Sequence, residues 1–147
     1  MPTRSRRATV ALMIAALGIL VETRSLNAQT AEETVLFIWT GMDEKQAGRT
    51  ITKLSNCRYV ITHKAENVET ETTVDFSDVT VFRVTDQVRP RVIVQGIDLQ
   101  ARITDPKTRD TKEIKKKVHE WATFAPAERM EKAIAYFRGS FCKGRAF

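Results

Sequence analysis

The longest apolar stretch of the chain runs from residue 8 to residue 21, with Thr9 as its only polar member. Three arginines precede it within the first seven residues. A membrane-spanning helix needs roughly 20 apolar residues, whereas the apolar core of a secretory signal has about 7–15. We therefore predict a signal peptide over residues 1–28, cleaved after Ala28, and a single domain over residues 29–147 with no transmembrane segment. An uncleaved N-terminal anchor is the alternative.

The second apolar stretch, VLFIW at residues 35–39, is ambiguous, because five consecutive apolar residues fit a buried strand as well as a helix. Thr30 and Glu33 just before it have the spacing of a capping box, in which each side chain bonds the other residue's backbone amide. The apolar residues that recur at helical spacing are Val35, Ile38, Trp39 and Met42. We predict a helix from residue 31 to about residue 42, with a buried strand as the alternative.

Alternating apolar and polar positions, rich in β-branched residues, dominate from Gly48 to Phe124 and are typical of strands. The segments with this pattern are residues 50–52, 58–63, 69–76, 79–84, 91–103 and 118–124. Gly96 lies inside one of them and indicates a bulge or a sharp bend. Residues 105–117, which contain the sequence KTRDTKEIKKK, are predicted to be a polar excursion between strands.

The last segment has the pattern of an amphipathic helix that begins near Pro126. Its apolar stripe consists of Met130, Ala133, Ile134, Phe137 and Phe141. No helical crossover separates the strands, so the sheet should be antiparallel. The predicted fold class is α+β: a short N-terminal helix, an antiparallel meander of five to six strands, and a C-terminal amphipathic helix packed on the sheet.

Charge and cysteine content extend this picture. The chain carries a net charge of +6, but four Arg and one Glu belong to residues 1–28, which leaves +3 on the rest. A charge of this size in an exported protein does not indicate nucleic acid. Cys57 and Cys142 are the two cysteines. In an exported chain two cysteines predict one disulfide, with two separate buried thiols as the alternative.

The spacing of the reactive residues gives little support for a catalytic site or a metal site. Cys57 and His63 are six residues apart, which on one strand would separate them by roughly 20 Å. His119 and Cys142 could approach only from distant segments. None of these four residues shows the close pairing of a zinc site, and there is no glycine-rich phosphate loop. We therefore expect neither catalysis nor a cofactor.

A cluster of lysines is the remaining candidate site. Its members are Lys112, Lys115, Lys116 and Lys117. Such a cluster could bind an anionic surface, for example a phospholipid headgroup or a polysaccharide. Runs of charge are more commonly just exposed to solvent, and a solvated loop is the simpler interpretation.

Four short motifs resemble a loose group of small exported bacterial proteins of unknown function. These are EET at residues 32–34, NCRY at 56–59, DFSDV at 75–79 and AERMEKA at 127–133. A meander closed by one C-terminal helix also resembles the pleckstrin-homology superfold. That resemblance implies a binding scaffold, although a fold does not determine a function.

The sequence thus predicts a periplasmic or secreted domain that is not an enzyme and binds an unknown protein or a component of the cell envelope. The alternative is a small hydrolase or metal-dependent enzyme that uses His63 and His119.

Overall fold

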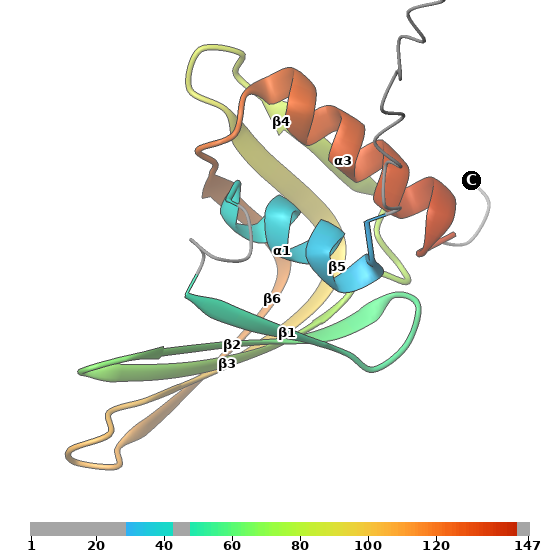
Figure 1. Cartoon of the computed structure of the whole chain (residues 1–147). Coiled ribbons are helices and arrows are strands. Elements are labelled where there is room, and N and C mark those ends of the chain that lie inside the picture. Colours follow the sequence, from blue (N-terminus) through green and yellow to red (C-terminus); the bar gives the residue numbers. More distant parts are fainter. Residues whose placement is uncertain (1–28, 43–47, 144–147) are drawn as a thin grey trace, which may run out of the picture.

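The structure is a computed structural model that describes residues 29–42 and 48–143. The predicted signal peptide and its cleavage site lie outside the described residues. One six-stranded antiparallel sheet curves around two helices, which both lie against its inner face (Figure 1). In chain order the elements are α1 (Ala31–Thr40), β1 (Arg49–Lys53), β2 (Arg58–Ala65), β3 (Val68–Asp75), β4 (Val81–Thr85), β5 (Arg91–Thr104), β6 (Thr111–Ala122) and α3 (Ala127–Ser140). The α+β class is confirmed.

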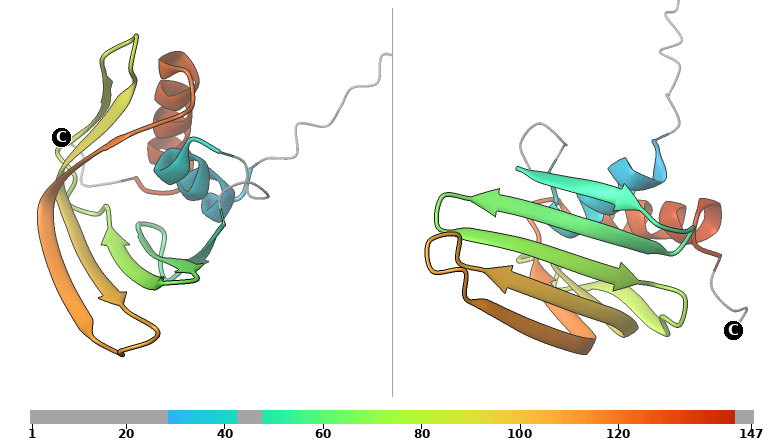
Figure 2. Two further views of the ribbon diagram at one scale, coloured as in Figure 1. Left: turned by 90° about the vertical axis from the view of Figure 1, so that its left-hand side faces the viewer. Right: turned by 90° about the horizontal axis from the view of Figure 1, so that it is seen from below.

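The strand order departs from a simple meander at β4. The sheet runs β1-β2-β3-β5-β4, and β6 pairs with the other edge of β5. β5 is strongly bent (Figure 2), and its two halves pair with β4 and β3 in succession. The change of partner falls between Gln95 and Asp98, at Gly96. Gly96 has φ +82°, and a Cβ there would collide with the backbone of Asp78. The predicted bend is confirmed, and it makes β4 a partner of β5 rather than of β3.

The apolar stretch at residues 35–39 is helical, as its cap predicts. The Thr30 hydroxyl accepts from the Glu33 amide at 3.1 Å, and the Thr30 amide donates to the Glu33 carboxylate at 2.8 Å. The helix ends at Gly41, whose φ is +70°. A Cβ on Gly41 would collide with Thr123, so this glycine allows the end of α1 to lie against the segment that follows β6.

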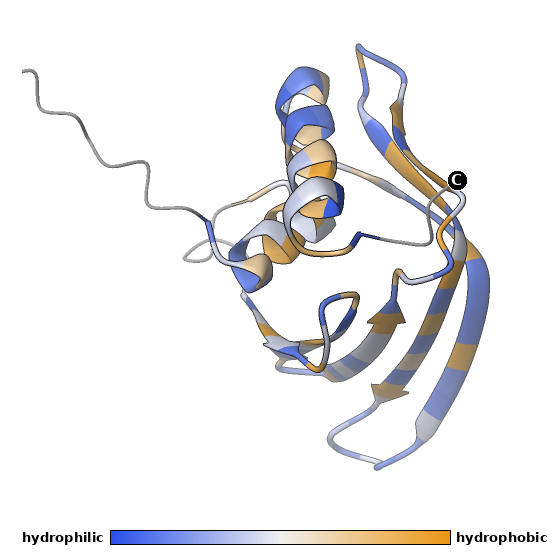
Figure 3. Ribbon diagram, turned by 90° about the vertical axis from the view of Figure 1, so that its right-hand side faces the viewer, coloured by the Kyte–Doolittle hydropathy of each residue, from blue (hydrophilic) through white to orange (hydrophobic). Residues whose placement is uncertain are grey.

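The hydrophobic core lies between the inner face of the sheet and the helices, where the apolar side of α3 faces inward (Figure 3). Met130, Ile134 and Phe137 of the predicted stripe are buried, while Ala133 and Phe141 are half-buried. Gly139 does not end the helix, which continues to Ser140.

The prediction of a polar excursion over residues 105–117 is wrong for its second half. Only residues 105–110 form a turn, and β6 begins at Thr111 as one arm of a long hairpin with β5. Most side chains between Thr111 and Val118 are exposed, so this part of β6 has no apolar alternation for a sequence pattern to detect. Pairing with β5 makes it a strand instead.

The predicted disulfide is confirmed. Cys57 lies just before β2, Cys142 follows the end of α3, and their sulfurs are bonded. The bond attaches the C-terminal helix to the sheet at a sequence separation of 85 residues.

Candidate binding surface on strand β6

The four lysines of the predicted patch lie on one strand but not on one face. Lys112 and Lys116 are opposite Ile103 and Leu99, on the inner face of the sheet. Lys115 is opposite Gln100, and therefore lies on the outer face. The ammonium of Lys117 contacts the Asp98 carboxylate at 3.3 Å.

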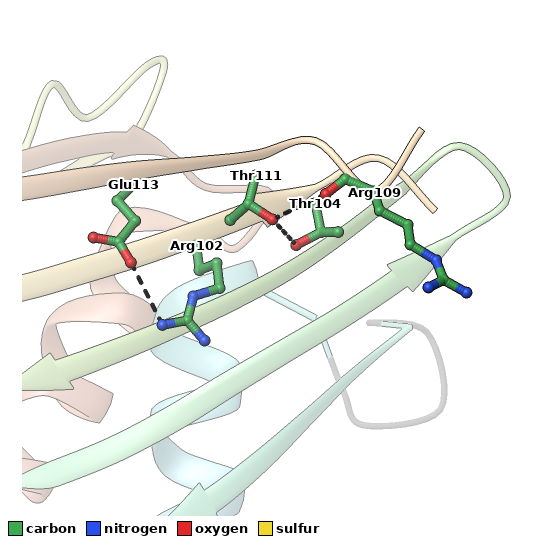
Figure 4. Close-up of polar contacts among 5 residues, drawn as sticks. All are labelled: Arg102, Thr104, Arg109, Thr111 and Glu113. Atoms are coloured by element: carbon green, nitrogen blue, oxygen red, sulfur yellow. Dashed lines mark hydrogen bonds and ion pairs between the residues drawn. The ribbon is translucent and has the colours of Figure 1, made fainter. Parts of the chain in front are cut away.

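Ion pairs neutralise the acidic residues of β6. The Glu113 carboxylate contacts the Arg102 guanidinium at 3.4 Å (Figure 4), and the Glu120 carboxylate contacts Arg91 at 2.6 Å. Among the described residues, by contrast, Lys112, Lys115 and Lys116 form no ion pair. We call these three the free lysines. They leave β6 itself with a surplus of positive charge, four lysines against two glutamates.

The hairpin that carries this surface is held by its own polar groups. Asp105 accepts hydrogen bonds from the amides of Lys107 and Thr108 at 2.7 and 3.2 Å, which fixes the turn. The hydroxyls of Thr104 and Thr111 lie 3.3 Å apart across the two strands (Figure 4). The hairpin extends beyond the helices as an arm whose β5 strand stays paired with β3 as far as Thr104 (Figure 2).

An aromatic cluster marks the other end of β6. The ring centroids of Trp39, His119 and Trp121 lie 4.9–5.5 Å apart in all three pairs. The Trp121 indole also donates to the Ile38 carbonyl at 3.2 Å. All three rings are half-buried. The sequence does not show whether Trp39 is buried or exposed. In the structure its half-buried ring packs against His119 and Trp121 of β6.

The environment of His119 lowers its pKa below the usual value of 6.5, first because the ring is partly removed from water and second because Lys116 is close by. The ring is therefore neutral at pH 7, which suits stacking against two indoles.

We expect the free energy of unfolding to fall with acidification below about pH 6.5 in proportion to this shift. The unfolded chain takes up a proton at His119 with an ordinary pKa, whereas the folded chain resists it until a lower pH. Stability is therefore fully present above pH 6.5 and is lost as the pH falls toward the lowered pKa. Urea unfolding between pH 7.5 and 5.5 should show a shallower pH dependence for His119→Gln than for the wild type. Equal slopes would contradict the assignment.

The other chemistry-bearing residues are not brought together. Cys57 and Cys142 are committed to the disulfide. The His63 ring Nδ1 lies 2.9 Å from the Gly48 carbonyl, in the cross-strand row that ends at Lys112 on β6. His119 is seven residues farther along β6, roughly 20 Å of strand. The described part of the chain contains no group of three or more His, Cys, Asp or Glu side chains placed to hold a metal.

The sequence predicted the lysine cluster as a candidate site, which stays a prediction, whereas the aromatic cluster was not predicted. The two-residue spacing of His119 and Trp121 in a predicted strand places both on one face, which was the available signal. Nothing local indicated that Trp39 would meet them, since that contact depends on α1 ending at Gly41.

Comparisons with protein-family models, with curated proteins and with solved structures gave no match to this chain. The resemblances to exported bacterial proteins and to the pleckstrin-homology superfold therefore stay predictions. Neither α1 nor α3, the helices that the structure describes, is long and apolar enough to cross a membrane.

Proposed function

We propose that this protein is an exported binding domain, periplasmic or secreted and without catalytic activity, that binds a negatively charged protein or a component of the cell envelope. The observation that carries the proposal is the surplus of positive charge on β6. Its acidic residues are paired with arginines of β5, while the free lysines Lys112, Lys115 and Lys116 are exposed and have no ion pair among the described residues. Positive charge held on this arm attracts anionic partners over several ångströms.

Export is supported by two independent features. The basic and apolar pattern of residues 1–28 is typical of a secretory signal. The Cys57–Cys142 disulfide fits an oxidising compartment, because such bonds persist outside the cytoplasm.

Capture from a cell-envelope fraction tests the proposal. Immobilised exported protein should retain an envelope component, and a variant with Lys112, Lys115 and Lys116 all changed to Ala should retain much less. The matched control changes Lys53, Arg83 and Lys143 to Ala, which are exposed and form no ion pair among the described residues, so that the net charge changes equally at other places. If the two triple variants capture the same material equally well, β6 is not the binding surface.

A further inference from the structure

Strand β6 presents a long free edge. Three strands of the described sheet pair on one side only: β1, β4 and β6. β6 has 12 residues, whereas β1 and β4 have five each. An unpaired strand edge is a row of backbone donors and acceptors that another extended chain can pair with.

The hydrogen-bond pattern of the hairpin identifies the groups on that edge. The Asp105 amide donates to the Asp110 carbonyl at 3.0 Å. Bonded and non-bonded pairs alternate along an antiparallel ladder, so the backbone groups of Lys112, Ile114 and Lys116 point toward β5. Those of Glu113 and Lys115 consequently point away from β5, toward the free edge.

The side chains beside this edge have a specific pattern of charge. On the inner face, Lys112 and Lys116 flank the half-buried Ile114. On the outer face, Lys115 is without an ion pair among the described residues, and Glu113 is neutralised by Arg102. A chain that lies alongside would therefore meet three cations and one apolar side chain within five residues.

We propose that β6 binds an acidic, extended segment of a partner protein as an additional strand of the sheet. This inference rests on the proposed function and specifies its partner and its mode of binding. Unpaired amides and carbonyls at strand spacing complement a peptide backbone, which a lipid headgroup or polysaccharide lacks. A second copy of β6 is the wrong complement, because its lysines would face these lysines.

The register specifies the segment. In antiparallel alignment, acidic side chains lie opposite Lys116, Lys115 and Lys112, and an aliphatic side chain lies opposite Ile114. A small neutral residue suits the position opposite Glu113. Read from its N-terminus, the complementary segment is EEVTE.

Titration of the full exported protein with a blocked, fluorescein-labelled peptide that contains EEVTE tests the proposal by fluorescence anisotropy. A second peptide carries N-methyl groups on the threonine and on the second glutamate, whose amides would face β6. It keeps every charge but loses two donors. We expect it to bind about tenfold more weakly or worse. A peptide with the glutamates changed to lysine should not bind.

Variants of the protein separate backbone pairing from charge. Lys115→Pro removes an amide that points to the free edge together with one cation, whereas Lys115→Ala removes the cation alone, and the ladder with β5 stays intact in both. Peptide binding should be lost in Lys115→Pro and only weakened in Lys115→Ala. The Lys53, Arg83 and Lys143 triple variant should bind like the wild type. Circular dichroism checks that Lys115→Pro is folded, and the N-methylated peptide decides the matter on wild-type protein if it is not.

Failure of this inference differs from failure of the proposed function. If both EEVTE peptides bind equally, or if neither binds while envelope capture still depends on the free lysines, then strand addition is wrong and an anionic partner is recognised by charge alone. If capture is also insensitive to the free lysines, both proposals fail.

Discussion

Changing Cys57 and Cys142 together to serine is expected to lower the free energy of unfolding by about 4–5 kcal/mol. The disulfide closes a loop of 85 residues, and the chain-entropy model assigns a stabilisation of this size, at the upper end of what is observed, to a loop of that length. Small domains have about 5–15 kcal/mol in total, so the variant should be close to unfolded. Urea unfolding followed by circular dichroism measures the difference.

The bond attaches α3 to the sheet, so the loss should appear in the whole domain rather than in one loop. Wild-type protein kept in reductant serves as the control and should match the double variant. A difference below about 1 kcal/mol between oxidised and reduced protein would show that the packing of α3 suffices without the bond.

Changing Phe137 to alanine is expected to lower the free energy of unfolding by about 3–5 kcal/mol. Its ring is fully buried at the centre of an aromatic group, with centroids 5.2 Å from Phe76, 5.9 Å from Tyr59 and 6.4 Å from Phe82. Removing the ring leaves a cavity in contact with both α3 and the sheet.

Phe124→Ala is the matched control, because that side chain is 80% exposed. It should change the free energy of unfolding by no more than about 0.5 kcal/mol. Equal effects of the two substitutions would contradict the placement of α3. Thermal unfolding of both variants with the disulfide intact provides the measurement.

Tyr59 belongs to this aromatic group and brings a polar hydroxyl into the core. Its hydroxyl donates to the Asn56 carbonyl at 2.9 Å. Burial, with a smaller contribution from the charge of Glu32, raises the pKa of the phenol to about 12. The group therefore stays neutral and bonded in the folded protein.

The elements that the sequence predicted correctly are those determined by residues close together in the chain. The Thr30–Glu33 cap and the stripe through Met130, Ile134 and Phe137 each lie within a few turns of helix, and both were confirmed. The disulfide was predictable because two cysteines allow only one intramolecular pair.

The failures involve partners that are distant in sequence. β6 between Thr111 and Lys117 is a strand because β5 pairs with it, and no alternation of its own residues records that. The position of β4 depends on the bend at Gly96. The lysines could therefore be predicted as a cluster. Their separation onto two faces of the sheet could not be predicted, because it follows from β6 being a strand.

The positions of the two cysteines have a consequence for the exposed hairpin. The turn at residues 105–110 extends into solvent, where proteases commonly cut a folded chain. Cys57 and Cys142 lie on opposite sides of this turn in the sequence. A single cut there would leave α1–β5 and β6–α3 as two chains joined covalently, with β6 still held in its ladder. The domain can therefore be nicked at this exposed turn without coming apart.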